Sequence, residues 1–362
     1  MGVTPEDRRF MAAAIRLSRQ HTGLTSTNPS VGCLVVKDGT ILASAVTAVG
    51  GRPHAETQAL ALAGEGARGA TVYVTLEPCS HWGKTPPCAD ALVAAGVARV
   101  VISLTDPDPR VSGRGIAILD AAGIAVECGV LEEDGRRALQ AYLMRHRHGR
   151  PHVTLKLAVS KDGKIGRTGH GQVAITGPVS RAQVQVLRAE MDAILVGIGT
   201  ALADDPELTV RLDGLQDRSP VRIVLDRRLR LPLTSKLVAT ARQVPVIVVG
   251  DGPAENALAL AEAGVEIIGA ADLPRLLSAL AARGLSSLLV EGGASVARSF
   301  LDAGLVDRIL LFEGNVLVGE GGIESPLVHD DMPPGFRLVR ADRFGDDRCC
   351  DYERTFECSP VS

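Results

Sequence analysis

The chain of 362 residues is long enough for two domains, and its 46% hydrophobic and 22% charged residues are ordinary for a globular protein. Its 39 lysines and arginines against 42 aspartates and glutamates give a formal net charge of −3, which argues against a general nucleic-acid binder. The charged N-terminal segment does not resemble a signal peptide, and no stretch is long and apolar enough to span a membrane, so we expect a cytoplasmic protein that acts on a small molecule.

The first third of the sequence alternates short helices and strands. Helices are predicted at residues 6–20, 55–63 and 88–95, and strands at 31–37, 41–46, 71–75 and 97–104. Asp38-Gly39 joins the first two strands as in a β-hairpin, and Gly64 and Gly96 end the second and third helices. This alternation favours an α/β fold with a mostly parallel or mixed sheet and helices packed on it.

A basic run at residues 145–151, Arg-His-Arg-His-Gly-Arg-Pro, follows these elements. Its polar composition with Gly and Pro is typical of a solvated linker, and its histidines lack the accompanying carboxylate or thiol that would indicate a metal site. We therefore place a boundary between a first domain, residues 1–147, and a second domain, residues 148–362. After it the alternation restarts, with predicted strands at 153–159, 193–197, 221–226, 246–249 and 288–290 and predicted helices at 180–189, 254–263, 273–282 and 295–303.

The most informative segment is Pro53-His54-Ala55-Glu56, followed by Pro78-Cys79 and then Cys88. One imidazole and two thiolates are suitable ligands for Zn²⁺ and leave its fourth position open for water. His54 and Cys88 both lie at the start of a predicted helix, where free backbone N–H groups favour a thiolate and orient a loop around an ion. His-x-Glu before one helix, Pro-Cys after a strand and Cys opening another helix form a combination typical of zinc-dependent deaminases.

Glu56 lies two residues after His54 in the same predicted helix, so its carboxylate can lie beside a water at the open position. Zinc lowers the pKa of such a water from ~15.7 towards ~7, but deamination also requires protons on a ring nitrogen and on the leaving ammonia. We therefore predict that Glu56 takes the proton of the water and delivers it to the substrate. Cys33 and Cys128 lie in apolar surroundings and are expected in the core.

The segment between the two cysteine ligands, residues 80–87, is longer than the two residues found there in most nucleoside and nucleic-acid deaminases. It carries His81 and Lys84 beside the predicted metal, and two cations suit an anionic substrate such as a sugar phosphate. A surface loop could also carry them without a role. The length of this segment and the lack of a basic stripe argue against a deaminase of nucleic-acid bases.

Further motifs extend along the chain. Residues 28–33 read Asn-Pro-Ser-Val-Gly-Cys, 75–81 Thr-Leu-Glu-Pro-Cys-Ser-His, 83–88 Gly-Lys-Thr-Pro-Pro-Cys and 106–109 Asp-Pro-Asp-Pro. In the second domain, residues 155–158 read Leu-Lys-Leu-Ala, 203–206 Ala-Asp-Asp-Pro, 208–211 Leu-Thr-Val-Arg and 290–293 Val-Glu-Gly-Gly. With these motifs in this order over nearly its whole length, the chain resembles the bifunctional deaminase–reductase family of riboflavin biosynthesis.

The resemblance implies a cytidine-deaminase-like N-terminal domain and a dihydrofolate-reductase-like C-terminal domain. The first would remove the 2-amino group of a diaminopyrimidinone ribosylamine 5′-phosphate with one Zn²⁺, and the second would use NADPH to reduce the ribosyl side chain to ribityl. For the deaminase, it implies zinc ligands His54, Cys79 and Cys88, the catalytic residue Glu56, and substrate contacts from Asn28, His81 and Lys84. For the reductase, it implies an NADPH site at Ala158, Thr200, Asp204, Gly292, Gly293, Ala294 and Ser295, and substrate contacts from Arg188, Leu208, Arg211 and Glu291. It implies no nucleic-acid or membrane partner, and it is compatible with a homo-oligomer without requiring one.

Without the resemblance, the second domain is less informative. Glu291-Gly292-Gly293 between a strand and a helix can cradle an anion, but it is not a dinucleotide-binding fingerprint, and such glycines often only form a turn. Arg188 lies at the end of a predicted helix, where cations are usually solvated, and Arg211 can equally be an exposed residue.

The sequence also departs from the family pattern at a few positions. Thr47 stands where many relatives have His, and Lys161 where they usually have Leu. Gln172 and Ala174 stand where relatives tend to have Ser and Trp. These changes leave open an alternative, in which an active deaminase is joined to a C-terminal domain that only binds a ligand or dimerises.

Overall fold

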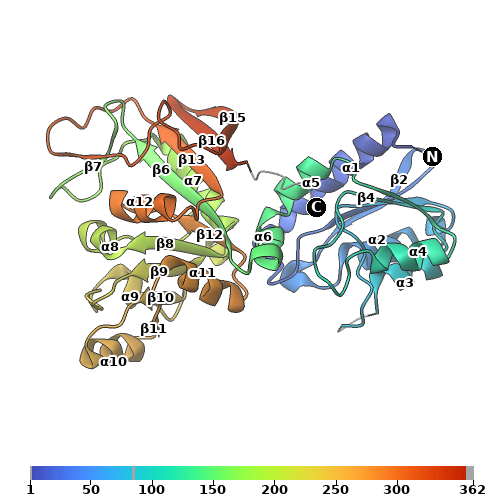
Figure 1. Cartoon of the computed structure of the whole chain (residues 1–362), viewed down its shortest axis with the longest axis horizontal. Coiled ribbons are helices and arrows are strands. Elements are labelled where there is room, and N and C mark those ends of the chain that lie inside the picture. The colour runs from blue at the N-terminus through green and yellow to red at the C-terminus, as the bar shows by residue number, and fades with distance from the viewer. Residues whose placement is uncertain (1, 84–85, 356–362) are drawn as a thin grey trace. The chain divides into compact units, whose positions relative to one another are not determined.

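The computed structural model describes residues 2–83 and 86–355 of the chain. It consists of two compact units, Met1–Gly149 and Arg150–Ser362, each with its own hydrophobic core (Figure 1). The division follows Gly149, whereas the sequence pattern placed it after residue 147.

Unit 1 is a five-stranded mixed sheet covered by helices. Its helices are α1 Pro5–Ser18, α2 Ala55–Ala63, α3 Cys88–Ala95, α4 Arg114–Ala121, α5 Glu132–Ala138 and α6 Gln140–His148, and its strands are β1 Gly32–Lys37, β2 Thr40–Val46, β3 Thr71–Val74, β4 Arg99–Ile102 and β5 Ala125–Cys128. The strand order is β2-β1-β3-β4-β5, with β1 antiparallel to both neighbours and β3, β4 and β5 parallel. Successive residues of β1 face opposite sides, so Leu34 packs in one core with Met11 of α1 and Cys33 in another with Ala59 of α2.

This topology brings the predicted zinc ligands of unit 1 to one edge of the sheet. The chain leaves β3 at Val74, passes Cys79 and enters α3 at Cys88. His54 is the N-cap residue of α2, which packs against β1 and α3. Two helix starts and the loop after a parallel strand therefore carry the three side chains, as is usual for sites in α/β folds.

Unit 2 is built on a nine-stranded sheet and a separate pair of short strands. Its helices are α7 Pro178–Ala189, α8 Ile198–Asp204, α9 Lys236–Ala239, α10 Ala254–Glu262, α11 Leu273–Ala282 and α12 Ala294–Asp302. Its strands are β6 His152–Val159, β7 Lys164–Arg167, β8 Ala193–Gly197, β9 Val221–Leu225, β10 Val246–Val249, β11 Glu266–Ile268, β12 Ser287–Val290, β13 Arg308–Glu313, β14 Gly322–Glu324, β15 Phe336–Phe344 and β16 Asp347–Arg354.

The large sheet has the order β11-β10-β9-β8-β12-β6-β13-β16-β15 and is parallel from β11 to β13. Leu155 of β6 packs with Leu277 of α11 and Phe300 of α12, whereas Ile194 of β8 packs with Leu187 of α7 in a second cluster. Because β8, β12 and β6 are parallel neighbours, their carboxyl ends open at the same edge of the sheet, where such sheets usually bind ligands.

Two sequence-based expectations are wrong. The run at residues 145–151 was expected to be a solvated linker, but its first four residues belong to α6. Leu143 and Met144 are buried and hold this helix against unit 1, and Gly149 ends it in the left-handed conformation. Cys128 was expected in the core, but it is exposed at the end of β5, because β5 is an edge strand of the sheet.

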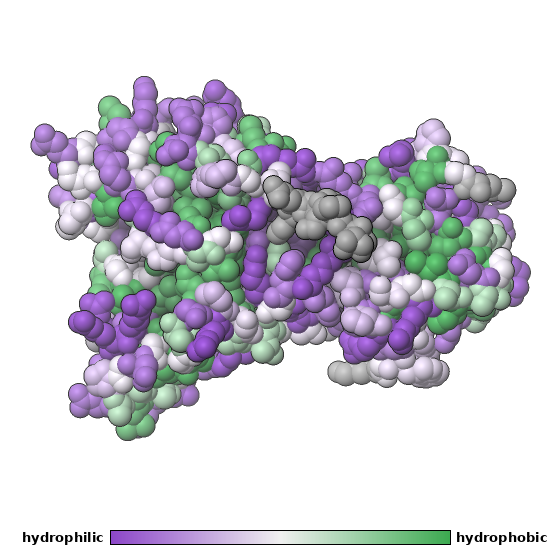
Figure 2. Space-filling view, viewed as in Figure 1, coloured by the Kyte–Doolittle hydropathy of each residue, from purple (hydrophilic) through white to green (hydrophobic). Residues whose placement is uncertain are grey.

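Polar residues dominate much of the visible surface. On the face shown in Figure 2, hydrophilic side chains cover large parts of each unit, with smaller hydrophobic areas between them. Within residues 2–83 and 86–355, none of the helices combines the length and the hydropathy that a membrane span needs.

Candidate active sites

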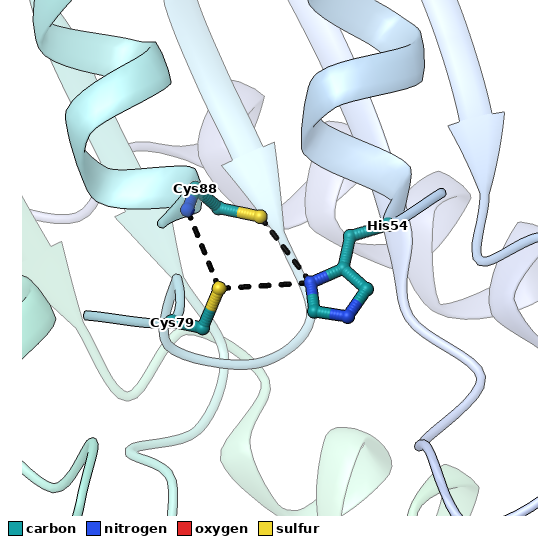
Figure 3. A group of neighbouring side chains, drawn as sticks. All are labelled: His54, Cys79 and Cys88. Atoms are coloured by element: carbon teal, nitrogen blue, oxygen red, sulfur yellow. Dashed lines mark hydrogen bonds between the residues drawn. The ribbon is translucent and has the colours of Figure 1, made fainter. Parts of the chain in front are cut away.

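Three potential metal-ligating atoms meet at one point of unit 1 (Figure 3). Nδ1 of His54 lies 3.6 Å from Sγ of Cys79 and 3.3 Å from Sγ of Cys88, and all three atoms lie within 4.8 Å of one another. The imidazole and the Cys88 thiol extend from the starts of α2 and α3, and Cys79 comes from the loop after β3. The structure thus brings together the residues that the sequence proposed as zinc ligands.

The donor set and its spacing fit a zinc ion. Bonds of about 2.3 Å to sulfur and about 2.0 Å to nitrogen at tetrahedral angles place the two donor atoms roughly 3.5 Å apart. Both nitrogen–sulfur separations at His54 are close to this value. One imidazole and two thiolates also leave one coordination position open, as in catalytic rather than structural zinc sites.

Hydrogen bonds from the start of α3 position Cys79 as a metal ligand. The backbone N–H of Cys88 donates to Sγ of Cys79 at 3.3 Å, and the N–H of Ala89 donates to its carbonyl oxygen at 3.2 Å. Hydrogen bonds from the Cys88 thiol, from His54 and from the Cys88 backbone outweigh burial and lower the pKa of Cys79 to about 4. Cys79 is therefore a thiolate at neutral pH, which is the form that binds metals.

Glu56 lies beside these ligands in the first turn of α2. Its side chain is buried, and burial raises the pKa of Glu56 to about 7 despite the opposing effect of His54. The carboxylate also accepts a hydrogen bond from the Cys88 thiol. A carboxyl group that titrates near neutral pH can both take up and release a proton, as a proton shuttle must.

Two of the residues proposed to contact the deaminase substrate, Asn28 and His81, lie in loops of unit 1. Asn28 lies in the loop before β1, and its side chain packs on Gly51, where an added Cβ would come within 2.4 Å of Nδ2 of Asn28. His81 follows Cys79 closely, and its Nδ1 is buried without a hydrogen-bond partner within the described part of the chain. Lys84 lies outside the described residues.

Thr47 has a structural role. Its hydroxyl accepts the backbone N–H of Val31 at 2.9 Å, and its carbonyl oxygen lies 2.6 Å from Nδ1 of His21. The side chain is buried, and its hydrogen bond ties the end of β2 to the start of β1.

Glu77 is a residue of this site that the sequence analysis missed. Its buried carboxylate accepts backbone N–H groups from Gly115 at 3.0 Å and Ile116 at 3.3 Å, and from Asp106 at 3.2 Å and Gly113 at 3.1 Å. Glu77 thereby ties the loop that contains Cys79 to the start of α4. Nothing in its spacing distinguishes it from an exposed glutamate.

We expect Glu77→Gln to lower zinc affinity about 10-fold or more, because changes to residues that support metal ligands have effects of this size. The glutamine amide replaces one carboxylate oxygen by an NH₂ group, which cannot accept the backbone N–H groups that Glu77 binds. The same change should reduce the free energy of unfolding of unit 1 by about 1–3 kcal/mol. Competition with a chelator and thermal unfolding measure the two effects. Glu65→Gln, at an exposed position of the same unit, is the control, and equal zinc affinity in both variants would contradict this role.

Unit 2 contains a cavity of about 870 Å³ at the carboxyl ends of β6, β8 and β12. It is lined by every residue that the resemblance implies for NADPH, namely Ala158, Thr200, Asp204, Gly292, Gly293, Ala294 and Ser295. Of the implied substrate contacts, Arg188, Arg211 and Glu291 also line it. Leu208 is not among the lining residues, and its side chain is buried in the adjacent hydrophobic core.

A buried ion pair forms one wall of this cavity. Nε and Nη2 of Arg188 donate to the two carboxylate oxygens of Glu291 at 2.8 and 2.9 Å, so Arg188 is not the solvated helix-end cation that its position in the sequence allowed. Burial alone would raise the pKa of Glu291, but the charges of Arg188 and Lys156 hold it below its usual value. Lys156, which the sequence analysis did not single out, lines the same cavity, and burial lowers its pKa.

Glycine allows two backbone segments to meet at the floor of the cavity. A Cβ at Gly197 would lie 2.7 Å from Cγ2 of Val296, which is too close for any other residue. The hydroxyl of Thr200 accepts the backbone N–H of Gly293 at 3.1 Å, so the start of α8 is joined to the start of α12. Free N–H groups at a helix start and the absence of side chains suit a phosphate group.

The remaining positions of interest vary in exposure. Arg211 is exposed and pairs with Glu207 at 3.3 Å, although it also lines the cavity. Gln172 and Ala174 line the cavity too, so the positions where relatives tend to have Ser and Trp do face it here. Lys161 is exposed and follows the end of β6.

Comparison with known proteins gives consistent matches in both units. Residues 4–104 match the cytidine and deoxycytidylate deaminase zinc-binding region, and residues 151–350 match the RibD C-terminal domain. The riboflavin biosynthesis protein RibD of Aquifex aeolicus (strain VF5) is 42% identical over 317 residues, which are 87% of this chain and 88% of the relative.

Solved structures agree over nearly the whole chain. Acinetobacter baumannii RibD, form 1, is 37% identical with a TM-score of 0.86, covering 97% of this chain and 99% of its own. The diaminohydroxyphosphoribosylaminopyrimidine deaminase/5-amino-6-(5-phosphoribosylamino)uracil reductase of Thermotoga maritima is 34% identical with a TM-score of 0.85, covering 96% and 99%. The predicted fold class, a cytidine-deaminase-like domain followed by a dihydrofolate-reductase-like domain, is confirmed.

Proposed function

Because the chain belongs to the RibD family of riboflavin biosynthesis proteins, we propose that its two sites perform two consecutive reactions on one small molecule. The enzyme is bifunctional, with a zinc-dependent deaminase in unit 1 and an NADPH-dependent reductase in unit 2. The substrate of the first reaction is 2,5-diamino-6-ribosylamino-4(3H)-pyrimidinone 5′-phosphate, and the second reduces the ribosyl side chain to ribityl. The observation that carries this proposal is the meeting of His54, Cys79 and Cys88 beside the buried carboxyl group of Glu56.

In the first reaction, hydrolysis replaces the 2-amino group of the pyrimidine by oxygen and releases ammonia. A zinc ion held by His54, Cys79 and Cys88 would supply Lewis acidity that makes a water molecule more acidic. Glu56 takes the first proton of this water and transfers it to the ring nitrogen. It then takes the second proton from the new hydroxyl group on the ring carbon and passes it to the amino group, which departs as ammonia while the carbonyl forms. Asn28 and His81 orient the substrate from the surrounding loops.

In the second reaction, bound NADPH would supply a hydride to C1′ of the ribosyl group, while the bond between C1′ and the ring oxygen breaks and that oxygen takes up a proton from water. We propose that Thr200 and Asp204 of α8 and residues 292–295 at the start of α12 hold this cofactor. Arg188 and Glu291 hold each other rigidly and, with Lys156, present charged groups to the polar atoms of the ribosyl phosphate. The alternative of a C-terminal domain that only binds ligand or dimerises loses support, because the Thermotoga maritima relative, which matches 96% of this chain, carries both activities in its name.

We further propose that the enzyme works in the reducing cytoplasm. The zinc site needs two reduced thiols, and the cysteines of the described residues are all free. Its partners are then its small-molecule substrates.

The function is tested by following both half-reactions separately. Zinc-loaded enzyme should release ammonia from the diaminopyrimidinone ribosylamine phosphate without NADPH, and should oxidise NADPH only when the deaminated product is present. Ammonia release without NADPH oxidation would support the deaminase assignment and contradict the reductase assignment. A lack of ammonia release would contradict the deaminase assignment.

Glu291→Gln should slow the reductase at least about 10-fold and leave deamination intact, because Arg188 loses its charged partner inside the cavity. Breaking a buried pair from one side should also cost about 3 kcal/mol or more of unfolding free energy. Asp351→Asn is the matched control, because it breaks the ion pair of Arg308 and Asp351 elsewhere in the same sheet. If both variants lost reductase activity equally, the effect would be one of stability and not of the cavity.

A further inference from the structure

Residues 207–211 of unit 2 form a segment beside the cavity that belongs to no helix or strand. Leu208 in this segment has a φ of +56°, a left-handed conformation that residues other than glycine rarely adopt. Such a conformation persists only where the surrounding structure holds it. Arg211, at the end of the segment, lines the cavity, so the contacts that hold this backbone also determine where the Arg211 side chain begins.

Side chains from other parts of unit 2 bind the backbone of this segment. Each contact is a hydrogen bond between one side chain and a main-chain N–H or carbonyl group of the segment. The pairs are Arg222 with the carbonyl of Glu207 (3.1 Å), Arg188 with the carbonyl of Thr209 (3.3 Å), Ser219 with the N–H of Val210 (3.0 Å) and Gln185 with the N–H of Arg211 (2.9 Å). The shape of the segment therefore depends on these side chains.

Gln185 makes the contact at the cavity end of the segment. It lies one turn before Arg188 in α7, and both side chains line the cavity. Oε1 of Gln185 accepts the backbone N–H of Arg211, and because a backbone N–H can only donate, this contact fixes which end of the amide group faces Arg211. Arg188 binds the same segment at Thr209 and also pairs with Glu291. One side of α7 therefore holds both the segment and the charged wall of the cavity.

The guanidinium group of Arg211 acts on charged groups of the cavity. Its Nη1 lies 3.3 Å from Oε2 of Glu207, and its charge also reaches Glu291. Burial raises the pKa of Glu291, but the charges of Arg188, Lys156 and Arg211 together lower it below its usual value. Within the described part of the chain, the charged residues that line the cavity are the cations Lys156, Arg167, Arg181, Arg188 and Arg211 and the anions Asp204 and Glu291. This excess of positive charge suits an anionic ligand, and the paired N–H donors of a guanidinium group suit a phosphate.

We propose that Gln185 is a positioning residue of the reductase site, which holds the backbone of Arg211 and thereby directs its guanidinium group to the phosphate of the reductase substrate. This inference rests on the proposed function, since that function supplies a substrate with a 5′-phosphate. Gln185 acts through Arg211 and does not need to touch the substrate. Without the amide oxygen, water can replace the acceptor at this exposed N–H group, and the segment becomes freer. Binding of the phosphate then has to order the segment, which costs conformational entropy.

The test compares the reductase reaction on two substrates, the deaminated product of the first reaction and its dephosphorylated form. Gln185→Met, which keeps the length of the side chain but lacks the amide oxygen, should lower kcat/KM for the phosphorylated substrate about 3- to 10-fold, the range expected for one neutral hydrogen bond. The loss should lie in KM rather than kcat, because Arg211 binds a group remote from the reacting carbon. The dephosphorylated substrate should change less than about twofold, because it lacks the group that Arg211 binds.

A double-mutant cycle tests whether Gln185 acts through Arg211. Arg211→Gln should lower kcat/KM for the phosphorylated substrate about 10- to 100-fold, the range expected for hydrogen bonds to a charged group. Adding Gln185→Met to Arg211→Gln should lower it further by less than about twofold, because the group that Gln185 positions is already gone. If the two effects multiplied instead, Gln185 would act independently of Arg211 and the inference would be overturned.

Gln183 offers a matched control. It is a half-buried glutamine of the same helix, but it is not among the residues that line the cavity. Gln183→Met should leave both kcat/KM values unchanged, and deamination by unit 1 should stay at the wild-type rate in both variants. An equal loss in Gln183→Met, or an equal loss of Gln185→Met on both substrates, would show that Gln185 only supports the fold and would overturn the inference.

Binding measured without turnover separates this inference from the proposed function. The deaminated product, titrated calorimetrically into the zinc-loaded full-length enzyme saturated with NADP⁺, should bind the wild type about 3- to 10-fold more tightly than Gln185→Met. The dephosphorylated product should bind both enzymes with affinities within about twofold of each other. If the wild type showed this difference in binding but did not reduce the product with NADPH, the proposed reductase would fail and the role of Gln185 would stand. Equal binding of the phosphorylated product by both enzymes would contradict that role.

Discussion

Cys79→Ala should leave the enzyme without stoichiometric zinc and without measurable deamination, while reduction of the deaminated product continues. Removal of one of only two thiolates leaves the ion with His54 and Cys88, and metal binding depends on the number of charged ligands. The backbone N–H of Cys88 also loses its acceptor, so the start of α3 no longer orients the loop. Elemental analysis per chain and the two separate half-reactions measure these effects.

Cys33→Ala is the control for this experiment. Cys33 is buried in the core of the same unit, and it is not among the ligand group formed by His54, Cys79 and Cys88. This variant should therefore lose some stability and keep its zinc. Deamination at the wild-type rate in Cys79→Ala, with no zinc present, would contradict the central claim about unit 1.

Glu56→Gln should retain zinc and lose deamination by about 10²- to 10⁴-fold, the usual contribution of a positioned acid–base group. Glutamine has nearly the same shape as glutamate, so it preserves the first turn of α2 and the neighbouring ligands. It cannot carry a proton between water, ring nitrogen and amino group, and each of these transfers is required. Zinc content, ammonia release and NADPH oxidation with the deaminated product together define the phenotype.

The second half of the enzyme provides the internal control for Glu56→Gln. Reductase activity at the wild-type level would show that the variant is folded and that only the first reaction is affected. Ammonia release at the wild-type rate by Glu56→Gln would contradict the role of Glu56 as a proton shuttle. Loss of zinc would instead indicate that the carboxylate supports the metal ligands.

The helices nearest to the zinc ligands were predictable because a glycine follows the last residue of each one. Helices at 55–63 and 88–95 end at Gly64 and Gly96, and the structure has α2 and α3 over the same residues. The helix α6 was missed because its last turn is basic and resembles a linker, while its two buried residues, Leu143 and Met144, give only a short apolar signal. Tertiary contacts, rather than local pattern, stabilise that helix.

The residues of the candidate sites also differ in whether the sequence alone could identify them. His54, Glu56, Cys79 and Cys88 were found from residue type and spacing, since few chemistries need that combination. Glu77 could not be found, because its role depends on four backbone groups that lie well beyond it in the sequence.

Lys156 did leave a signal that the sequence analysis did not use. It interrupts a run of apolar residues in β6 in which Leu155 and Leu157 are buried, and a cation at such a position needs a polar surrounding.

The two sites also differ in how much of the chain each one needs. The metal ligands and Glu56 come from one short stretch of a unit whose cores use no residue beyond Gly149. The cavity of unit 2 instead joins residues from Lys156 of β6 to Ile323 of β14, which span most of the second unit. Since chains emerge from the ribosome N-terminus first and domains fold as units, the deaminase can capture its metal while the reductase is still being translated.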